Sequence, residues 1–282
     1  MPTVEGCRNR KMGEWYDALP PLAHCSGNAG LVDYFGRKLV RKLPEEIIIG
    51  AAVVAVSSSN IHLYDKEGYQ YYADSVNKDY YQKVEIGKKA QKDGVIKGIL
   101  FHLEENNARD KNWPNYVKRI YENILKDLGL VAKDVPLFVG EVVCTEEGGI
   151  AGKHNAVVNT VPNYIPTAHV ISSKGLKPRP DNIHFSNEAY VTLGKRYADE
   201  VLKVVYNKNR GSNTNANNNS TTKNNKPVRE SVDGRCSEFE KEIIICPNNS
   251  CCSKYVVVVM DQPFVVKVVN PLLDAVIRLV SQ

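Results

Sequence analysis

The sequence predicts an α/β protein in which helices cover both faces of a parallel sheet. Short apolar runs of strand length recur along the first 206 residues, and the segments between them have helical periodicity. Because strands that alternate with helices form right-handed crossovers, the strands are expected to lie parallel. The 282 residues allow one full-sized core and a smaller appended segment.

The expected buried strands are Ile47–Val56, Val95–His102, Leu137–Val143 and His169–Ser172. The expected helices include Val32–Leu43, Asn112–Leu128 and Asn187–Val205. The second of these helices has Pro114 near its first turn and Gly129 just past its end, which are the favoured positions of these residues. The third follows Ser186, whose hydroxyl can cap the free amides of the first turn.

A change of composition divides the chain after residue 206. The stretch Gly211–Lys226 is almost entirely Asn, Ser, Thr and Lys, and it cannot bury enough apolar surface to order itself. We therefore predict a main domain at 1–206, a flexible linker at 207–235 and a small cysteine-rich segment at 236–282.

Charge and hydropathy argue against two classes of partner. The formal charge of +5 is spread along the chain without a Lys/Arg run or a basic stripe with interleaved aromatics, so nucleic acid is not expected. No stretch approaches the roughly 20 apolar residues of a membrane helix. Met1–Gly13 lacks the apolar core of a signal peptide, so a secretion signal is expected to lie upstream of this chain.

The cysteines indicate an oxidising, extracellular compartment. Four of the seven fall close together in the tail without metal-type C-x-x-C pairs, and these are Cys236, Cys246, Cys251 and Cys252. This pattern favours disulfides, with free thiols as the alternative. No metal and no cofactor are expected, because His24, His62, His154 and His169 have no ligand spacing with a second His or Cys.

The clearest chemical motif is Asp181-Asn182-Ile183-His184, in a loop just before the last predicted helix. A carboxylate three residues before a histidine can hold one ring nitrogen as a donor and leave the other to take a proton. Reactive groups of parallel sheets gather at the carboxyl ends of the strands, which here supply Ser57–Asn60, His102–Asn107, Glu141–Gly149 and Pro178–Phe185. The alternative is a loop Asp and a His near a helix start with no catalytic role.

Residues 13–202 resemble the carbohydrate acetylesterases of the SGNH-hydrolase superfamily, which include acetyl xylan esterases and sialate O-acetylesterase-like proteins. The resemblance is carried by GEWYDALPPLAHC at 13–25, DYFGRKLVRKLPE at 33–45, QKDGVIKGILFHLEENN at 91–107, DVPLFVGEVV at 134–143 and DNIHFSNEAYVTLGKRYA at 181–198. It implies a three-layer α/β/α fold of SGNH or flavodoxin-like type. It also implies a serine esterase in which Asp181 orients the general base His184.

The chain departs from the family at the nucleophile. The family's serine sits in a G-Q-S-N type motif after the first strand, ahead of the segment that matches GEWYDALPPL. Only about a dozen residues precede that segment here, and they contain no candidate serine. The nucleophile is therefore unassigned, and the first strand, which lies at the centre of the family's sheet, is expected to be missing. The alternative is that Tyr255–Val259 or Phe264–Val269 fills the gap.

Two further parts of the family's site are altered. Ser57-Ser58 replaces a glycine pair, and its backbone amides are expected to help hold the oxyanion; a less favoured alternative makes Ser57, Ser58 or Ser59 a substitute nucleophile. The family's H-Q-G-E motif appears as His102-Leu103-Glu104-Glu105. Glu105 is either a pocket carboxylate or a structural acceptor, and His102 is expected to be structural. These departures predict impaired activity.

The tail pattern CS…C…CCS after an Asn-rich linker resembles the dockerin modules that anaerobic fungi append to plant-wall enzymes. That resemblance implies a cohesin-type scaffold partner, and the alternative is an unrelated disulfide-stapled or partly disordered tail. The predicted function is a secreted carbohydrate O-acetylesterase acting on acetylated plant-wall polysaccharide such as xylan. The alternatives are a non-catalytic carbohydrate-binding relative of the esterases and a relic without function.

Overall fold

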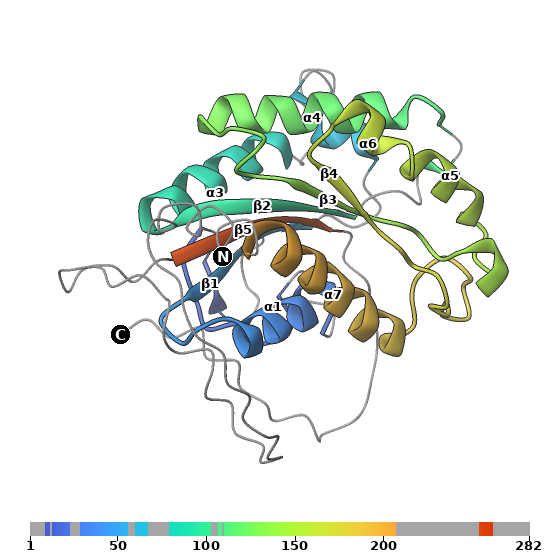
Figure 1. Ribbon diagram of the computed structural model, residues 1–282, viewed down its shortest axis with the longest axis horizontal. Coiled ribbons are helices and arrows are strands. Elements are labelled where there is room, and N and C mark those ends of the chain that lie inside the picture. The colour runs from blue at the N-terminus through green and yellow to red at the C-terminus, as the bar shows by residue number, and fades with distance from the viewer. Residues whose placement is uncertain are drawn as a thin grey trace, which may run out of the picture.

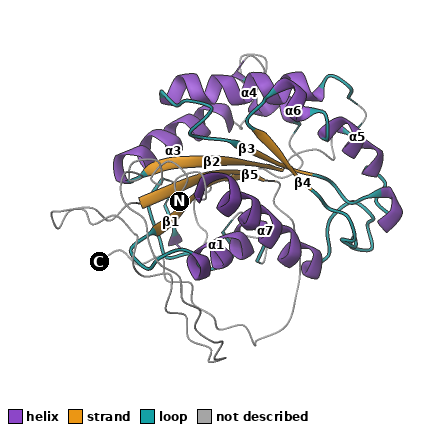
Figure 2. Ribbon diagram, viewed as in Figure 1, coloured by secondary structure: helices purple, strands orange, loops and turns teal. Residues whose placement is uncertain are grey.

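The computed structural model describes residues 9–11, 13–22, 29–55, 60–66, 79–102, 107–108, 110–206 and 254–261. A parallel sheet lies between two layers of helices (Figures 1 and 2). One face carries α3 (Asp79–Asp93), α4 (Trp113–Leu128), α5 (Asn155–Val158) and α6 (Val161–Tyr164), and the other carries α1 (Leu31–Lys42) and α7 (Asn187–Val201). The predicted α/β class, with a parallel sheet flanked by helices, is confirmed.

The sheet has the strand order β1-β5-β2-β3-β4, and every neighbouring pair is parallel. Its strands are β1 (Ile48–Ala55), β2 (Val95–His102), β3 (Leu137–Gly140), β4 (Ala168–Ile171) and β5 (Lys254–Asp261). All strands therefore end at one edge of the sheet, which we call the carboxyl edge.

The strand β5 lies between β1 and β2, although it follows all the other strands in sequence (Figure 1). It pairs along its whole length with β1, from Ile48 opposite Lys254 to Ala55 opposite Asp261. On its other side it pairs with β2, where Asp261 stands opposite His102. This is the central position at which a strand was expected to be missing, and the structure agrees with the alternative that Tyr255–Val259 fills it.

The direction of the crossovers is compatible with this position. From β1 through β2 to β3 the chain advances across the sheet with α3 and α4 on one face. From β4 to β5 it returns in the opposite direction, with α7 on the opposite face. A crossover that reverses both the direction and the face keeps the same hand, so the face on which α7 lies is compatible with a central β5.

The proposed division at 206 and 236 stays a prediction, because most of residues 207–282 lie outside the described ranges. The second candidate strand, Phe264–Val269, and the cysteines of the tail also lie outside them. Within the described ranges no helix combines the length and the apolar composition that crossing a bilayer requires.

The three predicted helices are present with shifted ends. Gly129 ends α4 with a φ of 64°, as its position past the helix predicted. Ser186 caps α7, and its Oγ accepts the Ala189 N–H at 3.2 Å. The helical segment predicted to end at Val205 ends at Tyr206, and its last part, Leu202–Tyr206, is a π-helix that follows the α-helix.

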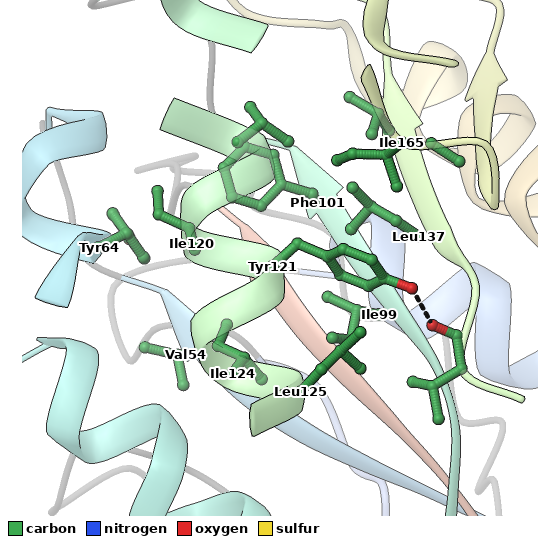
Figure 3. Packing of buried hydrophobic residues seen from close by; sticks show 14 of the residues in the cluster. Val54, Tyr64, Ile99, Phe101, Ile120, Tyr121, Ile124, Leu125, Leu137 and Ile165 are labelled. Carbon is green, nitrogen blue, oxygen red and sulfur yellow. Dashed lines mark hydrogen bonds between the residues drawn. The ribbon is translucent and has the colours of Figure 1, made fainter. Parts of the chain in front are cut away.

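Each face of the sheet has its own hydrophobic core. Figure 3 shows part of the core beneath α4, where Tyr121 lies among Ile99, Phe101 and Leu137. The Tyr121 hydroxyl donates to the Val135 carbonyl at 2.8 Å, so its one polar group is satisfied inside this core. The core on the other face is formed by α1 and α7 against the sheet.

Asp33 is a buried titratable residue in the first turn of α1. Its side chain is 1% exposed, and Oδ2 accepts the Gly30 N–H at 2.7 Å where the helix begins. Burial raises the pKa of Asp33 to about 6, although the bond from Gly30 and the nearby charge of Arg37 act in the opposite direction. The ionised carboxylate is thus disfavoured by the fold.

We expect Asp33→Asn to stabilise the protein more at pH 8 than at pH 4. A raised carboxyl pKa contributes stability that is full below the unfolded value of 3.8 and is lost as the pH rises through about 6. The amide keeps an acceptor for Gly30 and does not ionise, so the gain at pH 8 should exceed the gain at pH 4 by about 2 kcal/mol. Denaturant unfolding at the two pH values measures it, with the exposed Asp134→Asn as control. An equal gain at both values would contradict the burial of a titrating Asp33.

Val257→Pro tests the position of β5. Val257 pairs with Ala51 on one side and Gly98 on the other, so proline would remove a backbone donor from the middle of a central strand. We expect the free energy of unfolding to fall by about 3 kcal/mol. Val266→Pro, beyond the end of β5, is the matched control. A larger loss for the control would favour Phe264–Val269 as the inserted segment.

Candidate active site

The D-x-x-H motif lies in a tight loop between β4 and α7. The loop closes through an antiparallel bridge between Pro178 and Phe185, and the Arg179 N–H donates to the His184 carbonyl at 2.7 Å. This closure places Asp181 and His184 in a compact turn that begins a few residues after the carboxyl edge of the sheet.

The two carboxylate oxygens of Asp181 bind different partners. Oδ2 lies 2.7 Å from Nδ1 of His184. Oδ1 accepts the backbone N–H groups of Ile183 and His184, each at 2.9 Å. Asn182 takes a φ of 56°, a left-handed conformation that Asn adopts more readily than most residues. The spacing of the motif therefore lets one aspartate fix both the backbone turn and the imidazole ring.

The electrostatics of the loop keep Asp181 ionised. Burial acts to raise the pKa of Asp181, but the hydrogen bonds from the His184 ring and from the two backbone N–H groups outweigh it and lower the pKa to about 2. A carboxylate beside Nδ1 holds the ring proton there, and Nε2 is then the ring's acceptor. The side chains of His184 and Asp181 are 28% and 36% exposed, so the pair borders solvent.

A second loop, after β3, braces the D-x-x-H loop. The Ile150 N–H donates to the Asn182 carbonyl at 3.0 Å. Lys177 forms an ion pair with Glu147, which belongs to a short 3-10 turn at Thr145–Glu147. One brace thus attaches before Asp181 and the other attaches between Asp181 and His184.

The start of this second loop is fixed by side chains. The predicted strand Leu137–Val143 was too long, because regular pairing stops at Gly140. Beyond it, the Asn155 side chain accepts the Val142 N–H and donates to the Val142 carbonyl, both at 2.9 Å. An amide side chain thus satisfies the backbone groups that a neighbouring strand would otherwise pair.

His102 ends β2 and is buried, with 2% exposure. The Tyr197 hydroxyl lies 3.4 Å from its Nδ1 and donates to the Phe101 carbonyl at 3.0 Å. This position agrees with the interpretation of His102 as a structural residue.

Several predicted site residues lie outside the described ranges: Ser57, Ser58, Ser59, Leu103, Glu104 and Glu105. In sequence they follow β1, which ends at Ala55, and β2, which ends at His102. Their roles as oxyanion or pocket residues stay predictions, and the nucleophile remains unassigned. The structure brings together Asp181 and His184, and it adds a brace that the sequence motif did not reveal.

One solved structure supports the fold. A protein of known crystal structure from Arabidopsis thaliana superposes with a TM-score of 0.52 at 21% sequence identity, over 62% of this chain and 69% of that one. A lipase from a goat rumen metagenome gives a TM-score of 0.38 at 14% identity, over 60% of this chain and 86% of the lipase. The first likeness concerns the fold alone, and the second is too low to carry a conclusion.

The family comparison covers most of the chain before residue 206. The model that describes "carbohydrate esterase, sialic acid-specific acetylesterase" matches residues 2–203. This range contains β1 to β4, the Asp181–His184 pair and the loop that braces it. The chain therefore belongs to the carbohydrate esterase family of the sialic acid-specific acetylesterases.

Proposed function

We propose that this protein hydrolyses O-acetyl esters of carbohydrates, with His184 as the general base and Asp181 as its orienting partner. The observation that carries the proposal is the 2.7 Å contact between Nδ1 of His184 and Oδ2 of Asp181, in a chain of a carbohydrate esterase family. The low pKa of Asp181, about 2, supports it because the carboxylate stays charged beside the ring.

In this mechanism Nε2 of His184 takes the proton of an attacking hydroxyl. The hydroxyl oxygen bonds to the acetyl carbon, and the Asp181 carboxylate stabilises the imidazolium that forms. The imidazolium then gives its proton to the leaving sugar oxygen, and water attacks the acetyl-enzyme in the same way to release acetate. The family's nucleophile is a serine. Within this chain the nucleophile is unassigned, and the alternative candidates are Ser57, Ser58 and Ser59, which come shortly after β1 in sequence.

The substrate and the setting are proposed on the sequence resemblance. It favours acetylated plant-wall polysaccharide such as xylan, outside the cell, with the tail after residue 236 as a dockerin-like module for a cohesin-type scaffold. The support for the module is the cysteine pattern and the Asn-rich stretch before it.

The second candidate function is non-catalytic carbohydrate binding. It is supported by Leu103 and Glu104, which replace the amide and the glycine of the family's H-Q-G-E motif. A leucine cannot polarise a carbonyl, whereas a cleft that recognises sugar hydroxyls does not need that group.

The test is acetate release from p-nitrophenyl acetate and acetylated xylan by the full chain. We expect His184→Ala to lower the rate by about 10²–10⁴-fold, since the general base is lost. The matched control is His169→Ala, because His169 lies within β4 (Ala168–Ile171) and contacts Glu200 at 3.1 Å rather than the D-x-x-H loop, and this change should leave the rate unaltered. If the unmodified chain releases no acetate but binds acetylated xylan, the proposal of hydrolysis fails and carbohydrate binding takes its place.

Asp181→Asn tests the orienting role separately. The Asn carbonyl can still accept the backbone N–H groups of Ile183 and His184, but its NH₂ would face Nδ1 and move the ring proton to Nε2. We expect the ester hydrolysis rate to fall by about 10⁴-fold, as for the corresponding change in serine proteases. Nitrogen NMR of the His184 ring measures the tautomer directly. A ring that keeps its proton on Nδ1 in this variant would contradict the assigned role.

A further inference from the structure

Glu141 is a buried carboxylate immediately after β3, and its side chain joins two segments near the D-x-x-H loop. It is 8% exposed. Its Oε2 accepts the Ser173 N–H at 2.8 Å, and its Oε1 accepts Nδ2 of Asn159 at 2.6 Å. Ser173 begins the segment that leads from β4 to Asp181, so the carboxylate connects the ends of two neighbouring strands.

The two connected segments run together toward His184. We call residues 142–150 the bracing arm and residues 173–185 the catalytic arm. At their base, Glu141 holds Ser173, and the Ser173 hydroxyl donates to the Val142 carbonyl at 2.6 Å. At their tip, the Ile150 N–H donates to the Asn182 carbonyl at 3.0 Å. The arms are thus tied at both ends, with the Asp181–His184 pair next to the tip.

The base of the arms is also anchored to α5. The Asn155 side chain bonds both backbone groups of Val142, and Nδ2 of Asn159 donates to the Asn155 carbonyl at 2.7 Å as well as to Glu141. The Glu141 carboxylate therefore lies where the bracing arm, the catalytic arm and α5 meet.

We propose that Glu141 is a positioning residue for His184. Through Ser173 it fixes the catalytic arm against the bracing arm. The bond from the Ile150 N–H to the Asn182 carbonyl then keeps the turn with the Asp181–His184 pair in the same alignment. This inference rests on the proposed role of His184 as a general base. The Ser173 N–H is the decisive contact, because a buried backbone donor left without an acceptor forces the arm to shift or open.

Two variants of Glu141 separate positioning from charge. Glu141→Leu removes the acceptor of the Ser173 N–H. Glu141→Gln removes the charge, but its carbonyl can still accept the Ser173 N–H. Its NH₂ then points toward Asn159, whose exposed side chain can turn its oxygen to it by giving up the bond to the Asn155 carbonyl. We expect Glu141→Leu to shift the His184 ring NMR signals and to speed amide exchange of Ile150 by about tenfold or more. Glu141→Gln should retain both near the values of the unmodified chain.

Activity gives a second readout. We expect Glu141→Leu to lower kcat by about 10²-fold with little change in KM, because a displaced base slows the chemistry more than the binding. Ile120→Ala, in the core beneath α4, is the matched control for lost stability. It should lower the melting temperature without moving the His184 or Ile150 signals. Should Glu141→Leu be poorly folded, Glu141→Asp takes its place, because the shorter side chain draws its oxygens back from the Ser173 N–H, and it should shift the same signals.

The proposal is overturned if Glu141→Leu, or Glu141→Asp in its place, leaves the His184 and Ile150 signals unchanged. It is also overturned if Glu141→Gln shifts them as far as Glu141→Leu does, since charge and not the bond to Ser173 would then be responsible. The NMR readouts do not require ester hydrolysis. If the unmodified chain is inactive while the signals respond as expected, the proposed function fails and the positioning role of Glu141 stands.

Discussion

Helices cover both faces of the sheet, so each strand has to satisfy its backbone groups through its neighbours in the sheet. This constraint is most severe between β1 and β2, which both hydrogen-bond to β5. The helix α1 packs on β1 and on α7, and α7 in turn begins where the D-x-x-H loop ends. Pairing at the centre of the sheet therefore supports the layer next to the loop that holds His184.

The parallel arrangement also decides where polar groups meet. Because the strands share one carboxyl edge, the segments after β3 and β4 leave the sheet side by side and can be joined by one carboxylate, that of Glu141. The loops that follow are held by hydrogen bonds between backbone groups and short polar side chains. The candidate site is therefore held in place by contacts at the carboxyl edge of the sheet, while the Asp181–His184 pair at the tip of the D-x-x-H loop borders solvent.

The sequence predicted those strands and contacts that depend only on residues close together in the chain. Val95–His102 is an apolar run bounded by turn residues, and the strand has these limits in the structure. The contact between Asp181 and His184 follows from their spacing in one turn. The early end of β3 was not predictable in the same way, because it depends on Asn155, which the fold brings to Val142. Nor does a local pattern show that Asp33, in the first turn of α1, is buried.

The position of β5 has a consequence for synthesis of the protein. The ribosome makes β1 to β4 and their helices before residues 254–261, so the centre of the sheet stays open while the remaining chain is translated. During that interval the facing edges of β1 and β2 lack their partner, and exposed strand edges recruit other chains. The late strand is itself rich in valine and has no charge from Tyr255 to Met260, a composition that favours association between nascent chains. Chaperones that shield strand edges are therefore expected to matter more for this protein than for α/β proteins whose central strand is made first.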